Sequence, residues 1–188
     1  MLEFSLWKEP LEDPGIRVFV AVHEGEVVGA TEYRYYEDTN TAMTDFTIIG
    51  REGLAIGRFL TEQRSKDLFA LAEAAGKKLR GMFAEIYNPY LVEDEGFGGV
   101  KPMNPFVRRE VLSHMGYRRL DFTYVHPSWK KNDGEVVTGL DLCFLPYDGN
   151  EESIEAGLVA AFLRRYYAAL SEKPQQWEEM VQALEKKR

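Results

Sequence analysis

The chain has 188 residues, the length of a single domain with a substantial hydrophobic core. Its formal net charge of -8 at pH 7 argues against nucleic acid or an acidic membrane surface as a partner and favours a cationic substrate. The single cysteine excludes an internal disulfide, and the three histidines are too scattered for a metal site, so we expect no metal.

The N-terminal region carries no targeting signal. No basic segment is followed by an apolar one, and no apolar run approaches the roughly 18 residues of a membrane span. We therefore expect a cytoplasmic protein with no membrane partner. Residues 1–16 contain Pro10, Pro14 and Gly15, which interrupt regular structure, so we expect an irregular arm there.

Three β-branched and apolar segments follow, over residues 17–22, 27–36 and 41–49. Short polar turns join them, which predicts three consecutive antiparallel strands. A helix is expected from Ile56 to a stop at Gly76, and residues 79–87 are predicted to form a buried strand. Because a helix connects them, residues 41–49 and 79–87 should lie side by side and parallel.

The next region predicts a loop, a helix and two strands. Residues 90–103 are rich in glycine and acid, which is typical of a lid or binding loop and also of a solvated insertion. Asn104 and Pro105 predict the start of a helix that Gly116 ends. Residues 118–126 and 135–147 predict two strands, and Cys143 in the second is expected to be a small core residue.

Residues 149–188 predict two amphipathic helices, the first capped by Asn150 and the second following Pro174. Their apolar stripes must be buried on the rest of the chain or on a second subunit, which allows a homodimer through these helices. We therefore expect an α+β fold with a mixed, mostly antiparallel sheet, a central parallel strand pair and a C-terminal helical pair. The predicted domains are residues 1–148 and an extension, 149–188, that packs on it or on a partner subunit.

The segment Ile48–Leu60 joins the end of a strand to the start of a helix through a glycine-rich turn. Ala55 and Gly57 have little or no side chain, so an anionic ligand could lie on the backbone N–H groups of the first helical turn. Arg58 adds a mobile positive charge. Close packing of the helix on a strand explains the small residues equally well.

The order of elements over Arg17–Tyr147 resembles the GNAT superfamily of acetyl-CoA-dependent N-acetyltransferases. Three short motifs carry this resemblance further. Residues 52–57 match the family's pyrophosphate loop, Gln/Arg-x-x-Gly-x-Gly/Ala, at its two small positions. Met115-Gly116-Tyr117 stands where the family has Leu-Gly-Phe, and residues 83–86, followed by Asn88, resemble its fifth strand.

The chain departs from the family pattern at three places. Glu52 occupies the first loop position, where an acid repels a phosphate unless its side chain turns away or Arg51 takes that role. The family's frequent tyrosine acid is Leu112 here. Residues 1–16 are too few for the strand and two helices that open the family fold, and the C-terminal helices could take over the position of those helices.

The resemblance implies acetyl-CoA as a co-substrate, with its pantetheine arm added like a strand beside residues 41–49. The chemistry that it implies is the direct attack of a primary amine, on a small molecule or a peptide, on the thioester. The implied contacts to acetyl-CoA are the backbones of Thr47 and Ile49 for the pantetheine arm, Ala55, Ile56, Gly57 and Arg58 for the pyrophosphate, and Asn88.

An ammonium group has no lone pair, so a base or a water chain must remove a proton before the attack, and the leaving thiolate needs an acid. Glu85 is the first candidate for the base and Asp45 the second, because each is an acid within an apolar strand run. Tyr87 or Tyr90 is the candidate acid. An exposed strand face, or hydrogen bonds that hold the acid in place, would also explain Glu85 and Asp45.

Glu32, Tyr33 and Tyr35 are interpreted as a solvent-facing strand surface, with the lining of an acceptor pocket as the alternative. The rival function is a non-catalytic acyl-CoA-binding or protein-interaction module, which Leu112, the imperfect loop and the amphipathic C-terminal tail all permit. An unrelated α/β domain that uses the glycine turn only for packing is a third interpretation.

Overall fold

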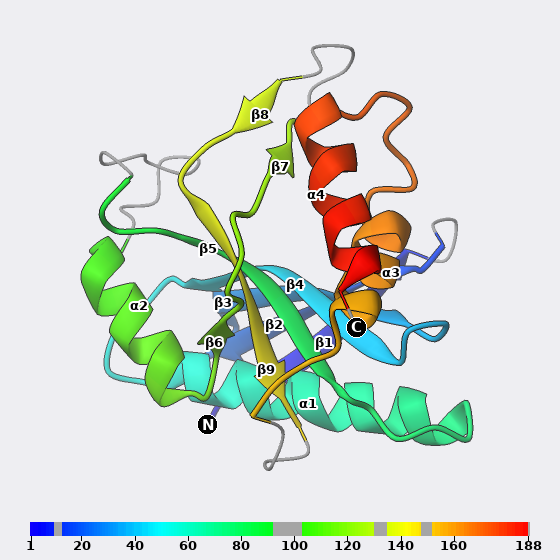
Figure 1. Ribbon diagram of the computed structural model, residues 1–188. Coiled ribbons are helices and arrows are strands. Elements are labelled where there is room, and N and C mark those ends of the chain that lie inside the picture. The colour runs from blue at the N-terminus through cyan, green and yellow to red at the C-terminus, as the bar shows by residue number, and fades with distance from the viewer. Residues whose placement is uncertain (10–12, 92–102, 130–134, 148–151, 188) are drawn as a thin grey trace. The chain divides into compact units, whose positions relative to one another are not determined.

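The computed structural model describes residues 1–9, 13–91, 103–129, 135–147 and 152–187 (Figure 1). Contacts between residues divide the chain into two compact units, Met1–Ala84 and Glu85–Arg188. Asn150 and most of the predicted loop 90–103 lie outside the described residues, as does the turn at 130–134. The predicted division into residues 1–148 and 149–188 stays a prediction.

The first unit is built on a sheet whose strands follow one another in chain order. Neighbouring strands β1 to β4 pair antiparallel, and the next strand along the sheet pairs parallel to β4. The predicted mixed, mostly antiparallel sheet with a parallel pair is therefore confirmed. The strands are β1 (Glu3–Glu9), β2 (Ile16–His23), β3 (Glu26–Tyr36), β4 (Thr41–Ile49) and β5 (Gly81–Tyr87), which continues into the second unit.

The irregular arm expected over residues 1–16 is wrong in part. The backbone of β1 pairs with β2 from Glu3 opposite Val22 to Glu9 opposite Ile16. Pro10, Pro14 and Gly15, which suggested the arm, all come after β1 in the sequence. They therefore do not interrupt this strand.

The turn between β2 and β3 has two central residues, Glu24 and Gly25, with φ angles of 53° and 82°. Two successive positive φ angles define a type I′ turn, whose twist matches that of the strands on either side. The turn sets the register at its end of the hairpin, with His23 opposite Glu26. An irregularity between Ala21 and Val22 then shifts the register by one residue, so that Phe19 pairs with Thr31.

The helix α1 (Ile56–Ala74) packs against β2, β3 and β4 of the same unit. It ends as predicted, because Gly76 takes a left-handed φ of 67°. A Cβ at Gly29 would lie 2.5 Å from Ile56 Cγ2, so only glycine lets the first turn of α1 approach β3 this closely. The buried face repeats every four residues and consists of Ile56, Leu60, Arg64, Leu68 and Ala72.

A charged contact fixes α1 on the sheet. The guanidinium of Arg17 donates to both carboxylate oxygens of Asp67, at 2.5 and 2.6 Å, and the hydroxyl of Tyr33 donates to the same carboxylate. Bidentate geometry of this kind is stronger and more specific than a single ion pair. It joins β2, β3 and the middle of α1.

Within the described residues, the second unit contains the end of β5, three helices, two further strands of the sheet and a short two-stranded pair. β9 lies between β5 and β6, and β7 pairs with β8. Its elements after β5 are α2 (Pro105–His114), β6 (Arg118–Arg119), β7 (His126–Pro127), β8 (Val136–Val137), β9 (Leu140–Pro146), α3 (Ala156–Tyr166) and α4 (Gln175–Lys186).

The continuous strands predicted over residues 118–126 and 135–147 are wrong. The N–H of Phe122 donates to the carbonyl of Leu120 at 3.0 Å, and this tight turn separates β6 from β7. Gly139 takes a left-handed φ of 83° and separates β8 from β9. The predicted cap of α2 is confirmed, because Asn104 Oδ1 accepts the N–H groups of Phe106 and Val107.

The C-terminal helical pair is confirmed, and α3 and α4 pack on each other (Figure 1). α3 begins at Ala156, later than predicted, because the backbone at Glu155 is still extended, with φ -66° and ψ 130°. Arg164 of α3 donates to Glu185 of α4 at 2.5 Å. The apolar stripes are buried within the chain itself, through Val159, Phe162 and Leu163 of α3 and Trp177, Val181 and Leu184 of α4. A homodimer through these helices stays a prediction.

Candidate functional site

The pairing of β4 with β5 ends before β4 does. The parallel register runs from Thr41 opposite Gly81 to Thr44 opposite Ala84, whereas β4 continues to Ile49. β3 still covers the other edge of β4 over this stretch, up to Gly29 opposite Ile49. The last five residues of β4 therefore extend beyond its paired register with β5.

Two residues at the end of β4 direct their backbone groups away from β3. The N–H of Gly50 donates to Val28 O at 2.9 Å, so position 50 faces β3. Backbone groups alternate between the two edges of an antiparallel strand, so Ile48 also faces β3, while Thr47 and Ile49 face the opposite edge. These are the two residues for which the sequence predicts contacts to a pantetheine arm.

Residues 50–55 connect the end of β4 to the first turn of α1. Ala55 takes a left-handed conformation with φ 52°, and its carbonyl accepts the first helical hydrogen bond, from Phe59 N. The N–H groups of Ile56, Gly57 and Arg58 belong to the first turn and have no partner within the helix. Such donors and the helix dipole favour an anion.

Close packing also contributes to the choice of glycine at position 57. A Cβ there would lie 3.0 Å from Ile49 Cδ1, so the first turn of α1 lies against the end of β4. The side chain of Arg58 is 84% exposed and pairs with Glu62 at 3.1 Å. Glu52 is exposed as well. Both sequence interpretations of the turn, a phosphate cradle and close packing, are compatible with this geometry.

The side chain of Thr47, an exposed residue, contacts a polar cluster under α1 whose other members, Thr31, Thr44 and Arg64, are buried. Its hydroxyl lies 2.8 Å from that of Thr31, and Arg64 Nη1 donates to Thr31, Thr44 and Thr47 at 2.8 to 3.2 Å. Arg64 is 2% exposed, and its Nε has no hydrogen-bond partner among the described residues. These contacts fix the side of β4 that faces the helix.

Asp45 lies beside Glu32, and the two are called the carboxyl pair below. The N–H of Asp45 donates to Glu32 Oε2 at 3.2 Å, and Arg34 Nε lies 3.4 Å from the other oxygen. Burial, and next the charge of Asp45, raise the pKa of Glu32 to about 8. The expected solvent-facing surface is wrong for Glu32 and Tyr33, which are 4% and 0% exposed.

Glu85, in the second unit, receives hydrogen bonds from three side chains. Its Oε1 accepts from the hydroxyl of Tyr124, from that of Tyr167 at 2.6 Å, and from His126 Nδ1 at 2.8 Å. The hydroxyls of Tyr124 and Tyr167 lie 2.8 Å apart, and so do Tyr167 Oη and His126 Nδ1. The side chain of Glu85 is 13% exposed. Glu85, Tyr124, His126 and Tyr167 are called the Glu85 cluster below.

The phenols of the Glu85 cluster remain protonated near neutral pH. Burial is the main cause that raises the pKa of Tyr124, with the charge of Glu85 next. Burial also raises the pKa of Tyr167, followed by the charges of Tyr124 and Glu85. Both hydroxyls are therefore hydrogen-bond donors, and the carboxyl of Glu85 is the group that accepts from them.

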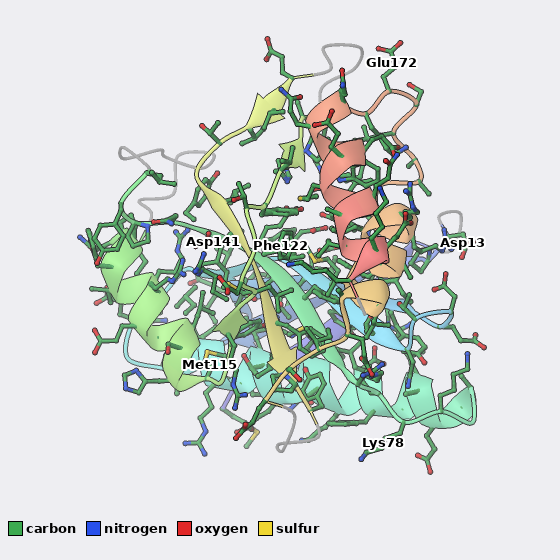
Figure 2. All side chains as sticks on the ribbon, viewed as in Figure 1. Asp13, Lys78, Met115, Phe122, Asp141 and Glu172 are labelled. Carbon is green, nitrogen blue, oxygen red and sulfur yellow. The ribbon has the colours of Figure 1, made fainter. Side chains whose placement is uncertain are left out.

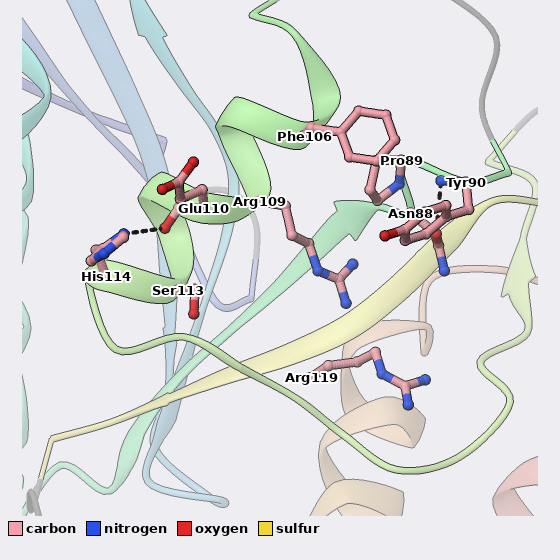
Figure 3. Close-up of a pocket in the computed structure, with 9 residues that line it drawn as sticks. All are labelled: Asn88, Pro89, Tyr90, Phe106, Arg109, Glu110, Ser113, His114 and Arg119. Carbon is pink, nitrogen blue, oxygen red and sulfur yellow. Dashed lines mark hydrogen bonds between the residues drawn. The ribbon is translucent and has the colours of Figure 1, made fainter.

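The pocket beyond the end of β5 contains Asn88 and Tyr90 (Figure 3). It has a volume of about 480 Å³, and Arg109 of α2 and Arg119 of β6 point toward the same space. Arg109 donates to Asp141 of β9 at 2.6 Å. Figure 2 labels Asp141. Asn88 is engaged in the turn itself, because its Oδ1 accepts Tyr90 N at 3.0 Å and its N–H donates to Gly139 O.

The structure therefore divides the predicted site residues between the two units. The first unit holds Asp45 and the residues predicted to contact acetyl-CoA from 47 to 58, and the second holds Glu85 and Asn88. Tyr87 ends β5 and is partly buried. The described residues contain no group of three or more metal-ligating side chains, and none of their helices is long and apolar enough to cross a bilayer.

Sequence reasoning missed three members of the Glu85 cluster. Tyr124 and His126 are two residues apart in an aromatic segment, which was the available signal, but nothing in it points to Glu85. Tyr167 lies 82 residues from Glu85 and follows α3. The contact of Tyr167 with Glu85 depends on how α3 packs, and the periodicity of apolar residues does not show that.

Neither a protein family model nor a curated protein matches the chain. Among solved structures, PaiA N-acetyltransferase from Thermoplasma acidophilum, in complex with coenzyme A, is similar over 70% of this chain and 61% of its own, at 12% identity and a TM-score of 0.45. The chain spans about three-fifths of the length of that enzyme.

Two further solved structures are similar to the chain. IAA acetyltransferase from Bacillus cereus shares 10% identity over 78% of this chain and 99% of its own, with a TM-score of 0.48. The ribosomal-protein-S18-alanine N-acetyltransferase from Escherichia coli shares 11% identity over 73% of this chain and 72% of its own, with a TM-score of 0.43.

Proposed function

We propose that the chain is a GNAT-type N-acetyltransferase that transfers the acetyl group of acetyl-CoA to a primary amine of a small molecule or peptide. One observation carries this proposal. The paired register of β4 and β5 ends at Thr44, β4 runs on to Ile49, and the first turn of α1 follows within a few residues. An extended ligand with an anionic group next to it suits such an arrangement.

The chain supplies donors and acceptors that fit acetyl-CoA. The N–H and C=O groups of Thr47 and Ile49 face the edge away from β3 and suit the amide groups of a pantetheine arm. The first-turn N–H groups of Ile56, Gly57 and Arg58 suit a pyrophosphate, with Ala55 small enough to let it approach. Asn88 is proposed as a further contact to acetyl-CoA.

The chemistry needs a group that removes a proton from the acceptor ammonium and a donor for the leaving thiolate. We assign the first role to Glu85, because donors converge on it, with Asp45 as the second candidate. Tyr87 is proposed as the acid. The net charge of -8 favours a cationic acceptor, and a cytoplasmic location follows from the sequence as a prediction.

The proposal is tested by titration calorimetry with acetyl-CoA on the wild type and on Ile49→Pro. Proline removes an N–H that faces away from β3, so the ladder to β3 stays intact while one hydrogen bond to the ligand is lost. We expect an affinity about 3- to 10-fold lower, the usual worth of one net hydrogen bond, with the melting temperature little changed. Ile49→Ala is the matched control for the lost side chain.

Turnover of acetyl-CoA with spermidine, free lysine and an alanine-initiated peptide then separates an enzyme from a binding module. Acetylated product with any of these amines supports the transferase. Binding of acetyl-CoA without turnover would favour the acyl-CoA-binding module, and no binding by the wild type would contradict the whole proposal.

A further inference from the structure

The ring of His126 is held through one of its two nitrogens. Among the described residues, all of its hydrogen bonds involve Nδ1, which lies 2.8 Å from Glu85 Oε1 and 2.8 Å from Tyr167 Oη. The residue is 7% exposed, and the rings of Tyr124 and Tyr167 contact it edge-on, at 6.3 and 6.0 Å between centroids. The ring orientation is therefore fixed by the rest of the Glu85 cluster.

Proton positions in the cluster follow from the donors and acceptors available. The hydroxyl of Tyr167 is closer to Glu85 Oε1, at 2.6 Å, than to His126 Nδ1, and it is assigned as a donor to the carboxylate. Both neighbours of Nδ1 are then acceptors, so Nδ1 must carry the proton. In the neutral ring the free lone pair consequently sits on Nε2.

We propose that His126 Nε2 is the atom that takes the proton from the acceptor ammonium, with Glu85 as the carboxylate that orients and stabilises the ring. This inference rests on the proposed acetyltransferase function. A carboxylate on Nδ1 with Nε2 left free is the arrangement by which a histidine serves as a general base in other enzymes. Glu85 then acts through His126 instead of directly.

The proton balance of the step is closed. Nε2 accepts one proton from the ammonium, and the neutral amine forms a bond to the thioester carbon while the C–S bond breaks. The second amine proton goes to the leaving thiolate, and the imidazolium releases its proton to solvent. Glu85 faces the imidazolium and stabilises its positive charge.

Tyr167 is a positioning residue in this scheme. It comes from the turn after α3, is fully buried, and stacks on Trp129 at 5.1 Å between ring centroids. Its hydroxyl holds both Glu85 and His126. The C-terminal segment is thus part of the proton-transfer machinery of the second unit.

The tautomer is tested directly, without substrate, by ¹⁵N NMR of the histidine rings in the full chain. The His126 signal is assigned by its loss in His126→Asn. We expect a protonated Nδ1 and an unprotonated Nε2 in the neutral ring, and Tyr167→Phe should weaken this preference. A neutral ring protonated at Nε2 would overturn the assignment regardless of any activity.

The role in transfer is tested with His126→Asn, whose amide can still donate to Glu85 but cannot accept a proton. With acetyl-CoA and the three amines above, we expect kcat to fall roughly 10²–10⁴-fold at neutral pH and to recover in part at high pH, with acetyl-CoA affinity unchanged. Tyr167→Phe should lower kcat about 10-fold and leave KM unchanged.

The outcomes separate this inference from the function on which it rests. A wild type that turns over while His126→Asn keeps its rate would overturn the role of His126 alone and return the proton to Glu85. A wild type that neither binds nor turns over acetyl-CoA would overturn the proposed function together with this role.

Discussion

The two glutamates that the two units largely bury, Glu85 and Glu32, are held in opposite ways. Two phenols and an imidazole converge on Oε1 of Glu85. Glu32 accepts one backbone N–H at 3.2 Å and has the carboxyl of Asp45 beside it, with Arg34 3.4 Å away. Convergent donors stabilise negative charge, whereas burial beside a second carboxyl disfavours it.

The contrast shows why burial alone does not identify a proton-transfer group. The pKa of Glu32, raised to about 8, would by itself suggest a base poised near neutral pH. Glu85, however, is hydrogen-bonded to the imidazole of His126, and an imidazole can take up a proton and pass it on. We therefore place the chemistry at the Glu85 cluster and assign the carboxyl pair a structural role.

The largest effect is expected from Glu85→Gln. Losing the carboxylate that orients His126 should lower the acetyl transfer rate roughly 10²–10⁴-fold near neutral pH while acetyl-CoA affinity is kept. Steady-state kinetics and calorimetry measure the two quantities. Asp45→Asn is the matched control and should change the rate by no more than a few-fold. Equal losses in both variants would break the contrast and indicate a shared proton path.

A smaller effect, on stability, is expected from Glu32→Gln. The folded-state pKa of about 8 lies above the ordinary glutamate pKa of 4.5, so between these pH values the native state holds more protons than the unfolded one. The free energy of unfolding should therefore fall as pH rises from about 4.5 to 8. In the wild type this fall should amount to a few kcal/mol, since one pKa unit corresponds to about 1.4 kcal/mol. In Glu32→Gln the fall should be absent, because glutamine does not titrate.

Denaturant unfolding at pH 5 and pH 8 measures this slope. Asp45→Asn should flatten it in part, because the charge of Asp45 is the second cause of the raised pKa. A wild-type stability that stays level or rises between the two pH values would show that Glu32 is not a buried, protonated acid.

Local signals in the sequence predicted the elements whose ends are set by neighbouring residues. The sequence predicts both ends of the strand over residues 41–49 correctly, and it predicts the start of α1 and its stop at Gly76. Asn104 was identified correctly as a cap. Each of these ends depends on a turn, a glycine or a capping side chain within a few residues.

Long-range pairing was not accessible in the same way. β1 is recognisable only through its pairing with β2, and residues 120–125 leave the sheet despite a strand-like composition. The sequence shows Glu85 as an acid in an apolar strand, but the partners of Glu85 lie 39 to 82 residues away in sequence. Alternation along a strand shows which face a residue occupies and not what meets it there.

The central claim, that acetyl-CoA lies along the end of β4 with its pyrophosphate on the first turn of α1, is tested most directly by calorimetry of Gly57→Glu. The new side chain adds negative charge among the first-turn N–H groups, and Gly57→Ala controls for the 3.0 Å approach to Ile49 Cδ1. We predict one acetyl-CoA bound per wild-type chain, retained binding in the alanine variant and lost binding in the glutamate variant, with all three proteins folded. Undiminished acetyl-CoA affinity in a folded Gly57→Glu would contradict it.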